Sequence, residues 1–297
     1  MEITFLGTSS MVPTKERNHS AILLTYKAEN ILVDCGEGTQ RQFRIAGISP
    51  MKVTRLLITH WHGDHVLGIP GLIQTLGANG YSKALEVYGP RGTPVFIERM
   101  LRAFVLQEKV QVKVHEITGE GKFLETEDFY IEAYGLEHTS PCLGYRFVEK
   151  DKLRINMEKL SKLGLKPGPI LKHLQRGKDI EWKGKNIKAE DVTSVKKGKK
   201  VAIATDTLYC SNLVKLAKDT DLFISEATLE KDMADKAIVT KHMTSVQAAE
   251  AAKKAKAKKL VLTHFSQRYR SVSKLKKEAR EVFKQAECAE DFMRIKL

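Results

Sequence analysis

The 297-residue sequence has no long apolar run and only four cysteines. No stretch approaches the roughly 18–20 apolar residues that a membrane-spanning helix needs. Residues 1–7 have the pattern of a strand and not of a basic segment followed by an apolar one, so we expect no secretory signal. These absences predict a cytoplasmic protein that does not associate with membranes.

The four cysteines are far apart in the sequence and form no Cys-x-x-Cys pair. Their spacing excludes a zinc ribbon and a dithiol redox motif. In a reducing compartment we expect no disulfides, so we interpret the cysteines as small buried hydrophobic residues. They are Cys35, Cys142, Cys210 and Cys288.

Acidic residues are too few to balance the basic ones: 36 Asp and Glu against 50 Lys and Arg give a net charge of +14. The excess is concentrated, because residues 150–200 carry a net +10 and residues 241–297 a net +9, which leaves −5 for the remainder. Such segments are typical of a surface that binds a polyanion. A solvated lysine-rich surface is an equally good explanation of the charge alone.

Short apolar runs alternate with amphipathic stretches, which predicts an α/β protein of layered sheets and helices. The segment at about 150–195 breaks this alternation, because it is rich in lysine and contains a Gly168-Pro169 turn. We therefore expect one domain over residues 1–297 with an inserted, protruding basic arm. Strands are predicted at 3–6, 21–26, 31–33, 56–59, 85–88, 129–133, 144–148, 201–205, 222–225 and 260–263, and helices at 39–46, 70–76, 93–104, 246–255 and 274–286.

Four side chains that can bind metal lie within six positions directly after the predicted strand 56–59: His60, His62, Asp64 and His65. Packing does not require three histidines and an aspartate here, since burying them without partners costs several kcal/mol each. In an extended segment His60 and His62 can project the same way, while Asp64 and His65 begin a loop and face a second centre. Imidazole and carboxylate are ligands that Zn²⁺ prefers.

Three more candidate ligands, His138, Asp206 and His264, follow apolar strands. Strand ends are where α/β enzymes present functional side chains. The combined set of seven is the number that two zinc ions need if one carboxylate bridges them, and such a site can hold a hydroxide and bind a phosphoryl group. Mn²⁺ or Fe²⁺ can occupy sites of this kind as well.

The pattern His60-x-His62-x-Asp64-His65, followed at wide intervals by the three further ligands, resembles the metallo-β-lactamase superfamily of four-layer αββα sandwiches. Four other motifs extend the resemblance to the ribonuclease Z family of tRNA 3′-processing endonucleases. They are residues 5–8, the Pro13-x-Lys15-x-Arg17-Asn18 motif, residues 34–40, and the pair 225–228 and 242–244. The first member of the 225–228 motif is usually histidine in this family, where this chain has Ser225.

The resemblance implies an endoribonuclease that cuts precursor tRNA after the discriminator nucleotide and leaves a 3′-hydroxyl and a 5′-phosphate. It implies that two zinc ions activate a hydroxide, that Asp64 accepts a proton, and that His242, oriented by Glu226, protonates the leaving oxygen. Substrate contacts are expected from Arg268, Lys15, Arg17 and Asn18.

The resemblance also assigns the basic segment. Members of the family carry a flexible arm between the motifs of His138 and Asp206, and a Gly-Pro element in it, here Gly168 and Pro169, grips the tRNA elbow. The short form of the family works as a homodimer in which one subunit's arm holds the tRNA that the other subunit cuts.

Two alternatives remain open at this stage. The same fold and metal ligands occur in hydrolases of small phosphodiesters and other esters. A non-catalytic RNA-binding protein with structural zinc is the second, although seven ligands exceed what structural zinc needs and His242 would then have no purpose.

Overall fold

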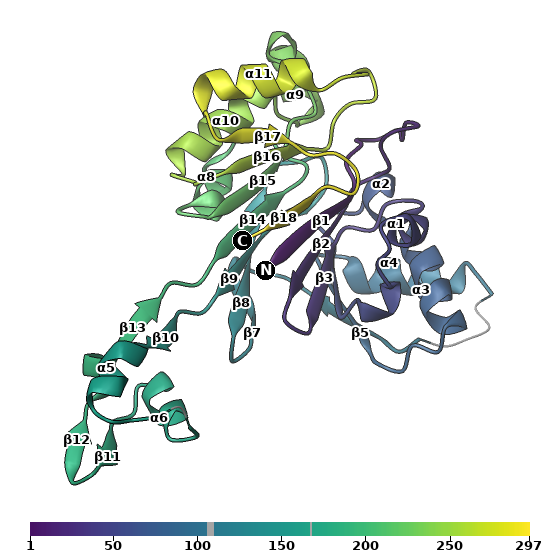
Figure 1. The fold of residues 1–297 in the computed structure, drawn as a ribbon. Coiled ribbons are helices and arrows are strands. Elements are labelled where there is room, and N and C mark those ends of the chain that lie inside the picture. The colour runs from purple at the N-terminus through teal and green to yellow at the C-terminus, as the bar shows by residue number, and fades with distance from the viewer. Residues whose placement is uncertain (106–109, 167) are drawn as a thin grey trace. The chain divides into compact units, whose positions relative to one another are not determined.

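The computed structural model describes residues 1–105, 110–166 and 168–297 (Figure 1). These residues form two compact units. The first contains Met1–Leu124, Ile131–Phe147 and Lys200–Leu297, and the second contains Glu125–Tyr130 and Val148–Lys199. None of the helices in this described part of the chain is long and apolar enough to cross a membrane.

The first sheet of the larger unit has seven strands in the order β18-β1-β2-β3-β4-β5-β6. Strands β3 to β6 are parallel, whereas β18, β1, β2 and β3 pair in antiparallel fashion. The strands are β1 (Glu2–Gly7), β2 (Ala21–Tyr26), β3 (Glu29–Val33), β4 (Arg55–Leu57), β5 (Leu85–Gly89), β6 (Val112–Glu116) and β18 (Arg294–Lys296).

The second sheet also has seven strands, in the order β17-β16-β15-β14-β9-β8-β7. Strands β14, β15, β16 and β17 are parallel, so their carboxyl ends meet at one edge. The strands are β7 (Gly121–Glu125), β8 (Phe129–Leu136), β9 (Cys142–Glu149), β14 (Lys200–Ala204), β15 (Leu222–Glu226), β16 (Leu260–Thr263) and β17 (Ala286–Cys288).

Helices cover one face of each sheet, and the other faces pack on each other. Side chains of β2, β3, β4 and β5 form one core with α1, α3 and α4, while β14, β15 and β16 form a second core with α8, α10 and α11. The sheets also touch directly, since Tyr145 Oη donates to the carbonyl of Ile58 at 2.6 Å. The predicted αββα sandwich is confirmed. The helices are α1 (Thr39–Ile45), α2 (Gly63–Val66), α3 (Ile69–Ala78), α4 (Thr93–Arg102), α8 (Ser211–Ala217), α9 (Ala234–Thr240), α10 (Ser245–Lys254) and α11 (Ser273–Val282), with short 3₁₀ turns at Pro50–Lys52 and Lys231–Met233.

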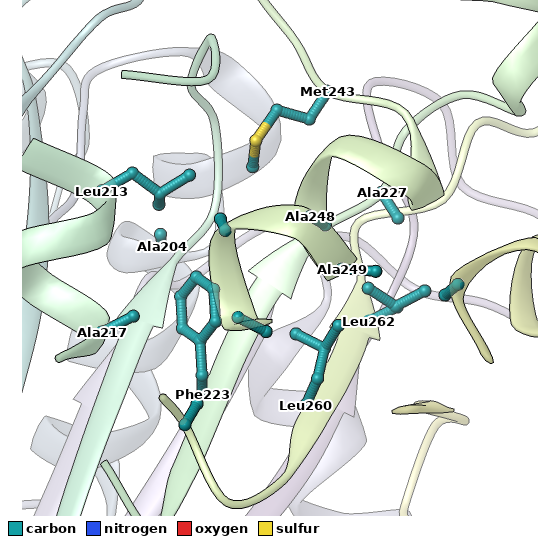
Figure 2. Close-up of a cluster of buried hydrophobic side chains, with 14 of the residues drawn as sticks. Ala204, Leu213, Ala217, Phe223, Ala227, Met243, Ala248, Ala249, Leu260 and Leu262 are labelled. Atoms are coloured by element: carbon teal, nitrogen blue, oxygen red, sulfur yellow. The ribbon is translucent and has the colours of Figure 1, made fainter. Parts of the chain in front are cut away.

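Small side chains let α10 lie close to the second sheet. Ala248 and Ala249 are fully buried against Phe223 of β15 and Leu260 of β16 (Figure 2). A larger residue at either alanine would overpack the core at a cost of about 1–3 kcal/mol. Thr244 caps the first turn of this helix and forms a complete capping box with Gln247. The charged residues that follow its alanines in the sequence lie on the exposed face.

The second unit has a small core of its own, which its lysine-rich sequence did not lead us to expect. Leu160, Leu165, Leu174 and Val192 are almost fully buried in it, and Trp182 packs against them. Leucines and isoleucines spaced among the lysines are sufficient for this, because the charged ends can remain in solvent. Its elements are β10 (Lys152–Ile155), α5 (Met157–Lys162), α6 (Leu171–Gln175), β11 (Ile180–Trp182), β12 (Lys185–Ile187), α7 (Ala189–Val192) and β13 (Thr193–Lys196).

The strand predictions at 21–26 and 260–263 match the structure residue for residue. The predicted C-terminal helix is wrong at its end, because α11 stops at Val282 and Ala286 begins β17. Ala286 pairs with Leu260 of β16. Tertiary pairing with a distant strand therefore overrides the helical preference of this alanine.

Candidate metal centre

The candidate ligands lie at strand ends of both sheets. His60 and His62 lie between β4 and α2, and Asp64 and His65 belong to α2. The other three lie within two residues of the ends of β8, β14 and β16, and the last two strands lie in the parallel part of the second sheet. Packing of the two sheets thus brings residues far apart in the chain to one edge: His138, Asp206 and His264.

The first group of ligands consists of His60, His62, His138 and Asp206, whose ligand atoms lie within 4.8 Å of one another. Asp206 Oδ2 lies 3.7 Å from His60 Nε2 and 3.6 Å from His138 Nε2. His138 Nε2 in turn lies 3.2 Å from His62 Nδ1. Three imidazoles and one carboxylate oxygen therefore converge on a common point.

The second group consists of Asp64, His65 and His264, with ligand atoms equally close together. His65 Nε2 and His264 Nε2 are 3.1 Å apart, and Asp64 Oδ2 lies 3.3 Å and 3.4 Å from them, respectively. Asp206 reaches this group with its other oxygen, because Oδ1 lies 3.1 Å from His264 Nε2 and 3.4 Å from His65 Nε2. The two oxygens of one carboxylate thus face two separate ligand groups.

The donor set fits a divalent metal. His60 Nε2 and Asp206 Oδ1 are buried and have no hydrogen-bond partner in the described part of the chain. A buried polar atom without a partner costs about 1–3 kcal/mol, and a metal ion held by each ligand group would satisfy one of these two atoms. Imidazole nitrogens and carboxylate oxygens are the ligands that Zn²⁺, Mn²⁺ and Fe²⁺ accept.

A second set of contacts orients the imidazoles. Asp34 Oδ2 lies 2.7 Å from His65 Nδ1, Thr228 Oγ1 lies 3.1 Å from His264 Nδ1, and the carbonyl of Lys241 lies 3.0 Å from His138 Nδ1. Each contact leaves the Nε2 atom free to face the centre, as metal-binding histidines require. Sequence patterns did not predict a role for these three residues, although Asp34 directly follows a strand, as His264 does.

The backbone is strained at two of these positions. Asp34 has φ 59° and His264 has φ 58°, in the left-handed region that non-glycine residues rarely adopt. Both residues immediately follow a strand, β3 and β16, and the left-handed turn directs each side chain into the site. Strain of this kind is concentrated at functional sites.

Burial and charge act in opposite directions on the ligands. Burial opposes the charged form of His65, but the carboxylates of Asp206, Asp34 and Asp64 outweigh it and raise its pKa well above the usual range. Burial and the neighbouring His65 lower the pKa of His60. Burial favours the protonated form of Asp64, but His65 and His264 keep its pKa below the ordinary value.

Glu226 and His242 lie beside the ligands. Glu226 is fully buried at the end of β15, and its Oε1 lies 3.1 Å from His242 Nδ1. His242 is partly exposed and lies 3.9 Å from Asp206 Oδ2. Burial disfavours the imidazolium, yet Glu226 and Asp206 outweigh burial and raise the pKa of His242 to about 9. The structure thus places an imidazole with a raised pKa at the edge of the metal centre.

A cavity of about 450 Å³ opens beside the ligands, and Met11, Lys236, His242 and Arg268 are among its lining residues. Arg268 Nε donates to Ser266 Oγ at 3.0 Å. No role for Lys236 was predicted from the sequence, because no motif includes it. It reaches the cavity only through the position of α9 in the fold.

Of the other predicted substrate contacts, Lys15 is exposed, whereas Arg17 and Asn18 are partly buried. Arg17 donates to two backbone carbonyls, and Asn18 Nδ2 donates to the carbonyl of Glu37 at 2.8 Å. Gly168 and Pro169 belong to the second unit, where both are exposed just before α6. Their contacts with a substrate stay predictions.

An αββα sandwich with a His- and Asp-rich centre at the strand ends defines a metal-dependent hydrolase. The sequence of residues 14–149 accordingly matches the metallo-β-lactamase superfamily. Ribonuclease Z of Methanothermobacter thermautotrophicus is 44% identical over 298 residues, which cover 100% of this chain and 97% of that protein. Ribonuclease Z of Pyrococcus horikoshii is 42% identical, covering 99% of this chain and 95% of its own.

A solved structure agrees with these relatives. The human short form of tRNase Z is 32% identical, with a TM-score of 0.71 and coverage of 100% of this chain and 99% of its own. The chain belongs to the ribonuclease Z family of the metallo-β-lactamase superfamily. It is a metal-dependent hydrolase and endoribonuclease.

Proposed function

We propose that this chain is a zinc-dependent endonuclease that cleaves precursor tRNA in the cytoplasm, directly 3′ of the discriminator nucleotide. Water breaks the P–O3′ bond, leaving a 3′-hydroxyl on the tRNA and a 5′-phosphate on the trailer. The names of the relatives and of the human structure support tRNA as the substrate. The observation that carries the two-metal chemistry is Asp206, whose two oxygens face different ligand groups.

One zinc would be held by His60, His62, His138 and Asp206, and the other by Asp64, His65, Asp206 and His264. When bound, two zinc ions supply hydroxide at neutral pH and neutralise the charge that develops on the phosphoryl oxygens. Mn²⁺ or Fe²⁺ could replace zinc in the same donor set.

His242 would protonate the leaving 3′-oxygen. Its imidazole lies at the cavity, and its Nδ1 is fixed by Glu226, so Nε2 is available for the substrate. A pKa of about 9 in the metal-free chain supports an imidazolium at neutral pH. Asp64 would accept the proton of the attacking water, and the backbone N–H of Met11, 2.9 Å from Asp64 Oδ2, fixes the orientation of that carboxylate.

Arg268 would hold the scissile phosphate, since a guanidinium can grip two phosphate oxygens. Lys15 is exposed on the loop whose Met11 lines the cavity, and it would contact the acceptor end of the tRNA. The basic second unit would hold the tRNA elbow through Gly168 and Pro169. We further propose a homodimer in which the arm of one subunit serves the metal centre of the other.

Gel analysis of a 3′-extended precursor tRNA tests the reaction. We expect one cut after the discriminator base, lost in Asp64→Ala and His242→Ala and retained in His115→Ala, a histidine outside the centre. A chelator should abolish the cut, and added Zn²⁺ or Mn²⁺ should restore it. If the metal-loaded wild type hydrolyses bis(p-nitrophenyl) phosphate but never cuts the precursor, the chain is a small-ester hydrolase and the tRNA proposal is wrong.

Mixing two inactive variants tests the dimer. Asp64→Ala keeps the arm, and a deletion of residues 155–190 keeps the metal centre. If arms act between subunits, mixed dimers regain one working centre, up to half of the wild-type activity per dimer. No recovery after confirmed subunit exchange would contradict an arm that acts between subunits.

A further inference from the structure

Arg17 lies in the N-terminal motif for which the family resemblance implies substrate binding, but its guanidinium is engaged elsewhere. Its Nη2 donates to the carbonyl of Tyr269 at 2.7 Å and to the carbonyl of Ser266 at 3.3 Å. These two carbonyls belong to the segment that carries Arg268. The guanidinium therefore holds the backbone on both sides of Arg268.

Burial separates Arg17 from its neighbour Lys15. Arg17 Nε has no exposed surface, and burial lowers the pKa of the guanidinium. Lys15 is exposed and makes no hydrogen bond or ion pair with any residue that the structure describes. A cation that already donates to backbone carbonyls inside the protein is poorly placed to donate to a phosphate, whereas Lys15 is free to do so.

The loop that carries Arg17 is also fastened to the metal centre. The N–H of Met11 donates to Asp64 at 2.9 Å, and the N–H of Ser10 donates to the carbonyl of Phe265 at 3.0 Å. The loop therefore contacts a ligand from α2 and the segment after β16 at the same time. Arg17 adds the link that reaches furthest along that segment.

We infer that Arg17 is a positioning residue, which holds residues 266–269 so that Arg268 faces the cavity, and that it does not itself contact the RNA. This inference rests on the proposed function, because it concerns how Arg268 reaches the phosphate. Arginine suits the role, since its long side chain brings one nitrogen, Nη2, to both carbonyls and its guanidinium stays charged. Lysine keeps the charge, but its side chain is one bond shorter, so its ammonium cannot reach the position of Nη2 and we expect weaker hydrogen bonds.

A double-mutant cycle tests the coupling, with kcat/KM on precursor tRNA as the measured quantity. Arg17→Ala and Arg268→Ala should each lower it by about 10- to 100-fold, the range expected when a contact is misplaced by about 1 Å. If Arg17 acts through Arg268, kcat/KM of the double variant should lie within about threefold of the value for the less active single variant. Arg17→Lys should recover part of the loss.

Lys15 supplies the matched control. The fold losses of kcat/KM in Lys15→Ala and Arg268→Ala should multiply in the double variant to within about twofold, as expected for independent contacts. If the fold losses of Arg17→Ala and Arg268→Ala also multiply, Arg17 acts independently of Arg268 and the inference is wrong.

Hydrogen exchange of the free protein tests the link without any substrate. The amide of Tyr269 donates to the carbonyl of Ser266 at 3.2 Å, and it should exchange at least about tenfold faster in Arg17→Ala, with Arg17→Lys intermediate and Lys15→Ala unchanged. Unchanged exchange in Arg17→Ala would overturn the positioning role. If the wild type cuts no precursor tRNA, the proposed function fails, and exchange alone decides whether Arg17 holds the segment.

Discussion

Replacing Glu226 with glutamine should destabilise the protein far more than the loss of one charge on the surface would. The carboxylate is fully buried and accepts hydrogen bonds at both oxygens. Oε1 accepts from Thr207 N–H at 2.7 Å and faces His242 Nδ1 at 3.1 Å, and Oε2 accepts from Thr228 Oγ1 at 2.7 Å and from Met243 N–H at 3.1 Å. Glutamine keeps the shape but turns one acceptor into an NH₂ donor.

The magnitude follows from these partners. The donors of Thr207 and Met243 are backbone N–H groups, which cannot reverse, so either orientation of the amide sets one of them against an NH₂ group. A buried donor left without an acceptor costs about 1–3 kcal/mol, and hydrogen bonds that lose a charged acceptor weaken by about half. Relief from burying a charge offsets part of this, so we expect a net loss of about 3 kcal/mol.

Urea unfolding of metal-loaded protein measures the loss. With a slope of about 3 kcal/mol per M, the midpoint should fall by about 1 M. Glu278→Gln is the control. Lys231 N–H and Ser245 Oγ both donate to Oε2 of this buried carboxylate, so the single oxygen of a glutamine amide can accept both hydrogen bonds. A midpoint for Glu226→Gln no lower than that of Glu278→Gln would refute the reasoning.

Three further predictions concern the centre, the cavity and pH. Asp206→Asn should lower the bound metal, measured by elemental analysis, to one ion or fewer per chain, because a neutral amide bridges poorly. Lys236→Ala should raise KM for precursor tRNA several-fold with kcat nearly unchanged, since Lys236 lines the cavity and adds a positive charge there; an unchanged KM would contradict this. Burial outweighs the hydrogen bonds from Asn18 and Thr8 and raises the pKa of Asp291 from 3.8 to about 6, so its contribution to stability is lost as the pH rises from about 4 through 6. Between about pH 4 and 6, the free energy of unfolding of Asp291→Asn should therefore rise relative to that of the wild type. A difference between the two that does not change with pH would contradict this prediction.

The ligands could be predicted from the sequence because their signal is local. Histidines and an aspartate crowd after one strand, and His138, Asp206 and His264 each follow another apolar run. Once the strands are recognised, the edge of the sheet brings these residues together. The strands themselves were found because most are buried on both faces, which produces continuous apolar runs.

The surroundings of the ligands could not be predicted in this way. Thr228 orients His264 across 36 positions of sequence, and no local pattern indicates which hydroxyl will lie beside which imidazole. Arg17 is a second example. Its guanidinium donates to the carbonyl of Tyr269, 252 residues later, so no local pattern shows that this cation is unavailable to a substrate. The three-residue strands β17 and β18 exist only through pairing with distant strands, so their own sequences carry little signal.

Strand β18 has a consequence for how the chain acquires its structure. It pairs with β1, so neighbouring strands of one sheet come from opposite ends of the sequence, and the metal ligands likewise extend from His60 to His264. Closing loops of this length is entropically costly and slows folding. During synthesis the first half emerges with part of a metal site and an unpaired edge on β1, an arrangement prone to aggregation. A complete centre needs the ligand that follows β16, so we expect a nascent chain to be inactive until His264 has been synthesised and has docked.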